Sequence, residues 1–356
     1  MRHLLDLPTA EFREWLAAVG QPTYRESQVR GWIMERRAVS FDDMTDLPAK
    51  LRQQLAAEFT LWTAKVARHS QSDDGTEKLL LELADGGRIE CVLLRDGPRR
   101  SICISSQVGC AMGCVFCASG LDGVDRNLTT GEILEQALLL QRLLPTDERL
   151  SHIVVMGMGE PLANFDNVVS AMQLMLDDHA YGISRRRLTL STSGIVPAMD
   201  RLRDACPVAL AVSLHAPNDA LRDELVPINR KYPIRELMAA CVRYIEKAPR
   251  DFVTFEYVLL AGINDSVAQA RDLVQTVKHV HCKINLIPFN PFPGSGYERS
   301  AIPAIAAFRD VLHQAGLTTT VRKTRGDTID AACGQLAGQV RDKTRRVQRR
   351  LEESRT

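Results

Sequence analysis

Three closely spaced cysteines are the residues of this sequence best suited to chemistry. Cys110, Cys114 and Cys117 form a CxxxCxxC pattern in a loop that also contains Gly113. Thiolates are soft ligands, and thiolates clustered on a short loop are typical of iron–sulfur centres. An ordinary [4Fe–4S] site uses four cysteines, one for each iron, whereas this group supplies three. The spacing therefore predicts a [4Fe–4S] cluster whose fourth iron is open to a small chelating ligand, such as the amino and carboxylate groups of S-adenosylmethionine.

Other uses of these cysteines fit the sequence less well. A structural zinc site needs four nitrogen or sulfur ligands, usually from two separated pairs, but Cys91 and Cys206 each stand alone. Structural thiols in a core rarely repeat at i, i+4 and i+7 within a glycine-containing loop. A disulfide framework requires an oxidising compartment, whereas nine cysteines without paired regularity favour a reducing cytoplasm.

The composition indicates one large catalytic domain with small additions. The chain has 356 residues, of which 45% are hydrophobic, enough for a sizeable core. It contains no apolar run of about 18 residues that would predict a transmembrane helix. The first residues include Asp6 and no long apolar stretch, so they do not resemble a signal peptide. We therefore expect a cytoplasmic protein with no membrane partner.

Local charge says more about partners than the net charge of +1 does. Three segments are rich in Arg and Lys: 185–187, 322–325 and 341–350. A single basic run is often only a solvated face. Three of them in a nearly neutral chain favour a phosphate-bearing partner.

The elements that must position the cysteine loop can be predicted from periodicity. Residues 1–60 predict short helices that form an accessory RNA-binding unit or, equally, a packing appendage. Residues 61–100 predict a β-hairpin extension with its turn at 85–87. We expect the catalytic barrel at 101–300, and a C-terminal segment with a basic helix at 301–356.

After the cysteine loop, short apolar strands alternate with helices. We expect strands at 152–156, 187–194, 208–215, 252–260 and 283–287, and helices at 129–144, 164–176, around Leu221 and Leu225, and at 266–277. Such alternation predicts right-handed βαβ units around a parallel sheet. Six units predict a barrel or partial barrel, with functional residues at the carboxyl ends of its strands.

With these motifs in view, the sequence closely resembles one family. The cysteine loop followed by Met156-Gly-Met-Gly-Glu-Pro161 is similar to radical S-adenosylmethionine enzymes. Further blocks resemble the RlmN family of dual-specificity RNA adenine C2-methyltransferases: residues 105–110, 190–194, 213–219, 285–294 and 325–338. The resemblance implies an α/β fold, the (β/α)6 partial barrel of radical SAM enzymes, carrying the helical, hairpin and basic additions described above.

The resemblance also implies a role for each site residue. Cys110, Cys114 and Cys117 would carry the [4Fe–4S] cluster. S-adenosylmethionine would be bound by Gly159, Glu160, Ser191, Ser213, Leu214, His215 and Asn290. Glycine lets the backbone approach a ligand, and the polar side chains offer hydrogen bonds. Without the family, Ser191 could be a helix cap and His215 a satisfied core residue.

In this family two further cysteines take part in the reaction, because C2 of adenine is difficult to methylate. C2 of adenine is electron-poor and cannot simply attack the methyl of a sulfonium. In the family, Cys333 takes a methyl group from one S-adenosylmethionine, and a 5′-deoxyadenosyl radical from a second one removes a hydrogen from that methyl, which then adds to C2. Cys103 would attack the Cys333 sulfur to release methylated RNA and form a disulfide. Glu90 would accept the C2 proton, with Cys103 as the other candidate.

The resemblance further implies partners. The substrates would be adenosine 2503 of 23S rRNA and adenosine 37 of tRNAs, gripped by the N-terminal helices and the basic C-terminal tail. A flavodoxin or ferredoxin type of donor would supply electrons, and a thiol reductant would reopen the Cys103–Cys333 disulfide. We expect the protein to be a monomer.

Two other functions compete with this interpretation. The related C8-methylating branch shares the cluster and both additional cysteines, but Pro161 and the blocks at 285–294 and 325–338 fit the C2 branch better. A non-catalytic RNA-binding protein with a structural metal is the alternative from another class. It would contain zinc and be colourless, whereas an iron–sulfur protein is brown.

Overall fold

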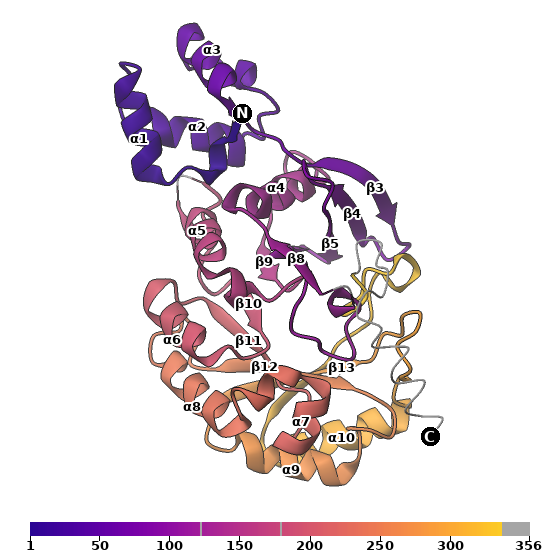
Figure 1. Ribbon diagram of the computed structural model, residues 1–356. Helices are drawn as coiled ribbons and strands as arrows, with labels where there is room; N and C mark the ends of the chain where they lie inside the picture. Colours follow the sequence, from indigo (N-terminus) through magenta and orange to yellow (C-terminus); the bar gives the residue numbers. More distant parts are fainter. Residues whose placement is uncertain (122, 179, 337–356) are drawn as a thin grey trace.

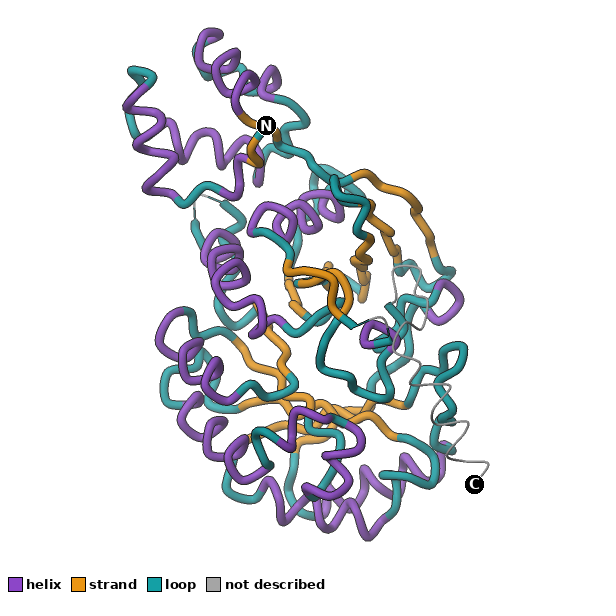
Figure 2. Tube along the Cα trace, viewed as in Figure 1, coloured by secondary structure: helices purple, strands orange, loops and turns teal. Residues whose placement is uncertain are grey.

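A ten-stranded sheet runs through the computed structural model, which describes residues 1–121, 123–178 and 180–336 (Figures 1 and 2). Its parallel strands are, in spatial order, β6 (Arg99–Cys103), β9 (His152–Val155), β10 (Leu188–Thr192), β11 (Ala209–Ser213), β12 (Val253–Leu259), β13 (Cys282–Pro288) and β14 (Thr318–Val321). Three antiparallel strands continue the sheet beyond β6, namely β5 (Arg88–Asp96), β4 (Glu77–Glu82) and β3 (Lys65–Gln71). The expected hairpin is therefore part of the main sheet, which also extends past residue 300 through β14.

Helices connect each parallel strand to its neighbour and cover the outer face of the curved sheet (Figure 1). The connecting helices are α4 (Thr130–Gln141), α5 (Phe165–Leu176), α6 (Val196–Ala205), α7 (Asp219–Leu225) with α8 (Ile234–Ile245), α9 (Val267–Val277) and α10 (Ile302–Gln314). This is the partial-barrel arrangement of βαβ units that the sequence predicts. Within the described residues, none of the helices combines the length and the apolar surface needed to span a bilayer.

The start of α4 illustrates how local sequence sets these elements. The Thr129 side chain accepts a hydrogen bond from the backbone N–H of Glu132, and the Glu132 carboxylate accepts one from the N–H of Thr129. This capping box satisfies two backbone donors that the first helical turn leaves unpaired.

The N-terminal unit is helical, as predicted, and is closed by a small parallel pair of strands that the sequence analysis did not anticipate. It contains β1 (Arg2–His3), α1 (Thr9–Ala18), α2 (Arg25–Met34), α3 (Ala49–Glu58) and β2 (Phe59–Thr60). Short 3-10 turns occur at Leu4–Asp6 and Phe41–Asp43 here, and at Ala118–Gly120, Pro161–Asn164, Pro227–Arg230 and Asp327–Ile329 farther along the chain. The first helix, α1, begins at Thr9 directly after Pro8 and has no side-chain cap.

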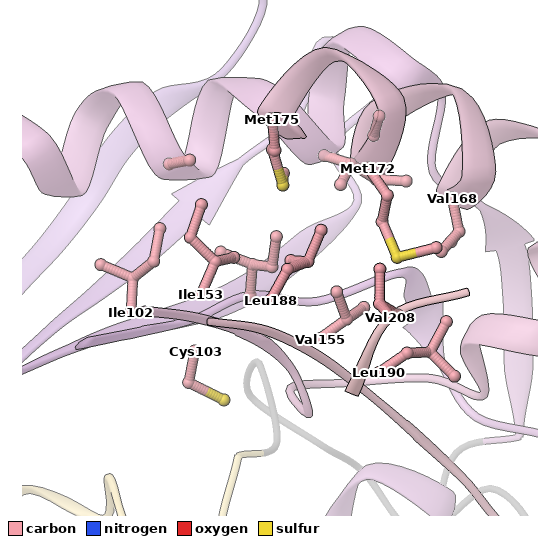
Figure 3. Packing of buried hydrophobic residues seen from close by; sticks show 14 of the residues in the cluster. Ile102, Cys103, Ile153, Val155, Val168, Met172, Met175, Leu188, Leu190 and Val208 are labelled. Atoms are coloured by element: carbon pink, nitrogen blue, oxygen red, sulfur yellow. The ribbon is translucent and has the colours of Figure 1, made fainter. Parts of the chain in front are cut away.

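The barrel core lies between the sheet and its outer helices. Figure 3 shows Met172 and Met175 of α5 packed over Ile153 of β9 and Leu188 of β10. The Cys103 side chain points to the opposite face of the sheet from Ile102, because successive side chains of a strand alternate between faces (Figure 3). Cys103 therefore projects toward the interior of the barrel. The basic segment 341–350 and the end of the 325–338 block lie outside the described residues.

Candidate active site

The cysteine loop is held between a small two-stranded sheet and α7. β7 (Gln107–Gly109) pairs with β8 (Val124–Asn127) in antiparallel fashion, and the N–H of Cys110 donates to Gly123 O at 2.7 Å. On the far side, the N–H of Val115 donates to Leu225 O at 3.2 Å. All three cysteines are half-buried thiols outside any disulfide. Burial raises the pKa of the Cys114 thiol, and the neighbouring Cys110 and Cys117 raise it further, so the three sulfurs interact closely.

A cavity of about 140 Å³ opens between this loop and the carboxyl ends of β9, β10 and β11. It is lined by all three cysteines and by Gly159, Glu160, Ser191 and Ser213, which the sequence assigned to S-adenosylmethionine. Met156, Gly157 and Ser193 also line it. The structure thus brings together four of the seven residues expected around S-adenosylmethionine. The other three, Leu214, His215 and Asn290, do not line this cavity.

Glu160 joins the ends of two strands under the cavity. Its carboxylate accepts hydrogen bonds from Ser193 N–H at 2.7 Å, from Ser193 Oγ at 2.8 Å and from Leu162 N–H at 3.1 Å. Burial raises the pKa of Glu160, and these hydrogen bonds oppose that rise. Gly159 precedes it with φ +100, and a Cβ there would lie 2.7 Å from the Gln107 side chain. Only glycine fits this close approach of the two chains.

Leu214 and His215 support the site from behind. Leu214 is fully buried. The His215 Nδ1 accepts from the N–H of Val258 at 2.9 Å, and its ring lies 4.3 Å from that of Phe116 in the cysteine loop. Burial lowers the pKa of His215 to about 3, with Arg222 adding to the effect, so the imidazole is neutral. The ring packs against the cysteine loop, and the expected contact of His215 with S-adenosylmethionine stays a prediction.

Arg222 is a supporting residue that the sequence analysis missed. Its side chain is fully buried and donates to the carbonyl oxygens of Ser193 at 2.7 Å, Ser213 at 2.9 Å and Leu214 at 3.1 Å. Burial lowers the pKa of Arg222 to about 10. The guanidinium therefore fixes the strand ends that line the cavity. A fourth acceptor is Asn229 Oδ1 at 2.9 Å. The three carbonyl groups lie up to 29 residues away in the sequence, so no local sequence pattern predicts this role of Arg222.

A second cavity, of about 80 Å³, contains the two cysteines expected to handle the methyl group. Cys103 at the end of β6 and Cys333 in the C-terminal segment both line it, together with Asn290, Arg322 and Cys117. Cys117 also lines the first cavity, so the two cavities adjoin at the cysteine loop. Asn290 thus belongs to the Cys333 side, where its Nδ2 donates to Cys333 O at 3.1 Å.

The segment carrying Cys333 is pinned against the cysteine loop. The N–H of Ala118 donates to Gly334 O at 2.7 Å, and Ser119 Oγ donates to Leu336 O at 2.5 Å. Gly334 has φ +85, and a Cβ there would lie 2.9 Å from Phe116 O. Residues more than 200 positions apart in sequence are therefore neighbours in the fold.

Arg322 is a cationic residue that lines the second cavity. The sequence analysis noted it only as part of a basic run. The Cys333 sulfur raises the pKa of Arg322, and Glu256 and Cys103 add to that rise. Burial raises the pKa of Cys103 to about 12, with Cys333 adding to the rise and Arg322 opposing it. All nine cysteines are thiols, so the expected Cys103–Cys333 disulfide is not formed in this structure.

Glu90 lies beside the second cavity without lining it. It occupies the same face of β5 as Val92 and Leu94, which do line the cavity. Lys78 Nζ lies 2.8 Å from Glu90 Oε1 and also donates to Asp330 O at 3.0 Å. Lys78 therefore connects Glu90 to the segment that carries Cys333.

The donor set can be tested against the group that a three-cysteine loop implies. Within the described residues, no group of three or more His, Cys, Asp or Glu side chains is arranged to hold a single metal ion. In a [4Fe–4S] cluster each thiolate ligates a different iron, so the three sulfurs need not converge on one point. Three thiols facing a cavity with strand-end serines and a buried carboxylate fit a cluster together with a polar ligand.

Comparisons with known proteins agree with this geometry. Residues 104–274 match the family model of the radical SAM superfamily. Residues 2–61 match the model described as the ribosomal RNA large subunit methyltransferase N-terminal domain. A solved radical SAM methyltransferase from Sphaerobacter thermophilus is 45% identical, with a TM-score of 0.91 over 95% of this chain and 100% of that chain.

Two other solved structures are far less similar. A domain of pyruvate-formate lyase-activating enzyme from Bacteroides vulgatus is 14% identical, with a TM-score of 0.39 over 49% of this chain and 99% of that chain. SuiB from Streptococcus suis is 13% identical, with a TM-score of 0.45 over 65% of this chain and 55% of that chain.

Proposed function

This chain belongs to the RlmN family of radical S-adenosylmethionine RNA adenine methyltransferases, and from that membership we propose that it methylates C2 of adenosine 2503 in 23S rRNA and of adenosine 37 in tRNAs. The superfamily implies a [4Fe–4S] cluster and S-adenosylmethionine. The observation that carries the proposal is the shared cavity of Cys103 and Cys333, next to the cysteine loop. A protein-borne methyl group needs those two sulfurs within reach of each other and of the cluster site.

The first cavity has the residues to hold both cofactors. Cys110, Cys114 and Cys117 would ligate the cluster, and the polar groups at the ends of β9, β10 and β11 would hold S-adenosylmethionine. When bound, the cluster supplies the electron that cleaves S-adenosylmethionine reductively. Glu160 and Arg222 orient the strand ends through hydrogen bonds to Ser193 and Ser213. The His215 ring packs against Phe116 of the loop, and these two buried rings exclude water from it.

The second cavity has the residues to transfer the methyl group. The Cys333 thiolate attacks the methyl carbon of one S-adenosylmethionine. A carbon–sulfur bond forms on Cys333, the bond from the methyl carbon to the sulfonium sulfur breaks, and S-adenosylhomocysteine leaves. A second S-adenosylmethionine is consumed in activating that methyl group, which makes two per turnover. Once the methyl carbon is joined to C2 of adenine, Glu90 accepts the C2 proton, while Lys78 holds its carboxylate in position. Cys103 remains the other candidate for this proton.

Cys103 then completes the reaction. Its thiolate attacks the Cys333 sulfur and a disulfide forms. The bond from Cys333 to the methyl carbon breaks, the carbon keeps the electron pair and takes up a proton, and methylated RNA is released. A thiol reductant must return both residues to thiols before the next cycle. This chemistry requires a reducing compartment such as the cytoplasm and an electron donor of the flavodoxin or ferredoxin type. We propose that a monomer suffices, because both cavities are formed by one chain.

The decisive experiment uses Cys333→Ala purified without oxygen. We expect it to keep its iron and its visible absorption but to transfer no methyl group to RNA. Cys103→Ala should keep the cluster and accumulate a covalent enzyme–RNA adduct. Cys206→Ala is the matched control, since Cys206 is buried, lines neither cavity and should leave activity unchanged.

The methylated nucleoside that the protein forms distinguishes between the competing functions. Mass spectrometry of digested RNA should show 2-methyladenosine in both substrates. Finding 8-methyladenosine instead would assign the chain to the C8-methylating branch. A colourless protein containing zinc, without methylation of any RNA, would favour the non-catalytic metal protein.

A further inference from the structure

Six cations gather at the end of the barrel opposite both cavities. Arg99 begins β6, Arg185–Arg187 directly precede β10, Arg250 precedes β12, and Lys283 is the second residue of β13. The register places them along one edge, since Ser101 pairs with His152, Arg187 O accepts from the N–H of Ile153, and Val253 pairs with Cys282. We call these six residues the strand-start patch.

The strand-start patch lacks its own counter-ions. Among the described residues, none of the six forms an ion pair with a carboxylate. Their hydrogen bonds go to neutral oxygens: Arg99 to Ser101 Oγ, Arg185 to Pro207 O, Arg186 to Pro249 O and Arg250 to Arg186 O. Nearby cations do have carboxylate partners: Arg203 of α6 pairs with Asp204, Arg243 of α8 with Asp200, and Lys247, just after α8, with Asp204.

Two carboxylates lie near the strand-start patch but are engaged elsewhere. Asp96 attracts Arg99, yet its side chain pairs with Arg325 at 2.6 Å. Asp251 lies 3.6 Å from the His281 ring nitrogen. The patch is thus an excess of positive charge in a chain whose net charge is only +1.

Three arginines of the strand-start patch lie close enough to His152 to shift its pKa. Its pKa is lowered to about 4, first by burial and then by Arg99, Arg187 and Arg250. These three guanidinium groups come from three separate segments and all lie near one imidazole. Burial lowers the pKa of Arg99, Asp96 opposes this shift, and Arg250 adds to it. Folding has therefore assembled mutually repelling charges, which an anionic partner would stabilise.

An aromatic ring lies within the same patch. Phe252 is half-buried, with the Arg250 guanidinium carbon 5.6 Å and Lys283 Nζ 4.3 Å from its ring centroid. The His281 ring approaches its edge at 6.3 Å. A half-buried aromatic ring beside cations is suited to stack an unpaired base and to hold the adjoining phosphates, once the cations turn from the ring to those phosphates. This combination favours RNA over an acidic protein or a lipid surface.

We propose that the strand-start patch is a second RNA-binding surface, remote from the catalytic cavities, which holds phosphates of the RNA that flanks the target and stacks an unpaired base on Phe252. The proposal rests on RNA being the substrate. Strands of four residues in β9 and seven in β12 separate the two edges of the sheet, which at about 3.3 Å per residue is roughly 13 to 23 Å. A minimal hairpin seated at Cys333 does not reach that edge, whereas a long RNA that wraps around the barrel does.

The test compares long and minimal RNA with matched variants. In Arg187→Gln/Arg250→Gln, we expect at least tenfold weaker binding to a 23S rRNA fragment with long flanks. The slope of log affinity against log salt should fall by about 1 to 2, because two phosphate contacts are lost. Phe252→Ala should weaken binding of fragments with single-stranded flanks at least fivefold. Arg201→Gln/Arg309→Gln is the control, since both of those arginines are already paired with aspartates.

Activity on the minimal hairpin controls for damage to the catalytic end. Methylation of that hairpin should be unchanged in every variant. If the double variant fails to fold, Arg186→Gln and Lys283→Gln, both at exposed positions, should each lower the salt slope. Wild-type affinity and slope for the long fragment in folded variants would overturn the proposal. So would loss of binding to phosphatidylserine vesicles without loss of RNA binding.

Measuring both RNA binding and RNA methylation distinguishes failure of the strand-start patch proposal from failure of the proposed function. A wild-type chain that binds long RNA with the expected slope but methylates neither RNA would reject the function and leave the patch supported. A wild-type chain that methylates both RNAs, with patch variants that bind equally well, would reject only the patch.

Discussion

At the scale of single residues, burial controls when Cys103 can react. The pKa of Cys103 is raised to about 12, and only the thiolate attacks another sulfur. Between pH 7 and 9 the group is almost entirely protonated, and each added pH unit increases the thiolate fraction about tenfold. We therefore predict that release of RNA from the enzyme adduct accelerates about tenfold per pH unit in this range. Single-turnover gel assays of adduct decay measure this rate directly.

Two variants test whether the pH dependence of RNA release comes from Cys103. Cys103→Ala should retain the adduct at every pH. Arg322→Gln should move the pH dependence to higher pH, because it removes the cation that opposes the raised pKa of Cys103. A release rate independent of pH would mean that the proton of Cys103 leaves before the attack, and would contradict the prediction.

Glu160 offers a second prediction for a single residue. Glu160→Gln preserves size but removes the charge that accepts from Ser193 N–H and Oγ. Hydrogen bonds to a charged group contribute about 1.5–3 kcal/mol, so S-adenosylmethionine should bind roughly tenfold or more weakly. Calorimetric titration of the reconstituted protein measures this affinity. Glu236→Gln, at an exposed position on α8, is the control, and equal affinities for the two variants would contradict the prediction.

The sequence could anticipate site residues whose signal is their type and spacing. The cysteine loop and the polar residues at strand ends belong to this class, since parallel strands deliver their carboxyl ends to one edge. Arg222 and Arg322 could not be anticipated, because their roles depend on carbonyl groups and sulfurs from distant segments. The side chain of Asn290 contacts the Cys333 backbone, and its expected contact with S-adenosylmethionine stays a prediction.

At the scale of elements, the segment carrying Cys333 depends on the β3–β4 turn. Asp74 accepts from the N–H of Gly326 at 3.0 Å and from that of Thr76 at 2.9 Å, and Ser72 Oγ lies 2.9 Å from Thr328 Oγ1. We predict that Asp74→Ala loosens residues 326–336 by about 1 kcal/mol, the net worth of such a hydrogen bond. Amide hydrogen exchange in that segment should then be several-fold faster, and methyl transfer to RNA slower, while the iron content stays the same.

The neighbouring aspartate provides the control for this prediction. Asp73 is exposed in the same turn, so Asp73→Ala should leave both exchange and activity unchanged. Identical exchange in the two variants would show that the turn does not restrain the segment.

Elements differ in how well local sequence reveals them. The capping box made α4 predictable, whereas α6, α8 and α10 were not anticipated. Each of those three helices begins beside a proline, at Pro197, Pro233 and Pro303. Proline is easily interpreted as a helix breaker, although its fixed φ and missing N–H suit the first turn of a helix. The parallel pair of β1 and β2 is two residues long on each side and carries no periodicity to detect.

At the scale of the whole molecule, the N-terminal unit is joined to the barrel and is not a detachable appendage. Asp6 accepts from the N–H of Gly131 at 2.6 Å, His3 lies 3.4 Å from Glu135, and Arg37 donates to Leu144 O and Glu148 O. Its apolar residues are part of the same core as those of the barrel. A truncation therefore removes contacts of α4 along with any RNA contacts.

We predict that deletion of residues 1–60 lowers the melting temperature of the remaining chain. Loss of the Gly131 and His3 contacts and exposure of apolar surface should each cost about 1–3 kcal/mol. Circular dichroism melts measure the effect, and an unchanged melting temperature would contradict it. Lower methylation by the truncated chain would then reflect stability as well as RNA binding.

Point variants of exposed arginines avoid this loss of stability. They compare RNA binding by the N-terminal unit with RNA binding by the strand-start patch. Several arginines of the N-terminal unit are already paired: Arg2 with Glu11, Arg13 with Glu26, and Arg36 with Asp46. A paired cation gains less from an RNA phosphate, because it must give up its carboxylate partner. We therefore expect Arg13→Gln/Arg36→Gln to change the salt slope of long-RNA binding less than Arg187→Gln/Arg250→Gln does. A larger change from the N-terminal pair would mean that RNA is held mainly by the N-terminal helices.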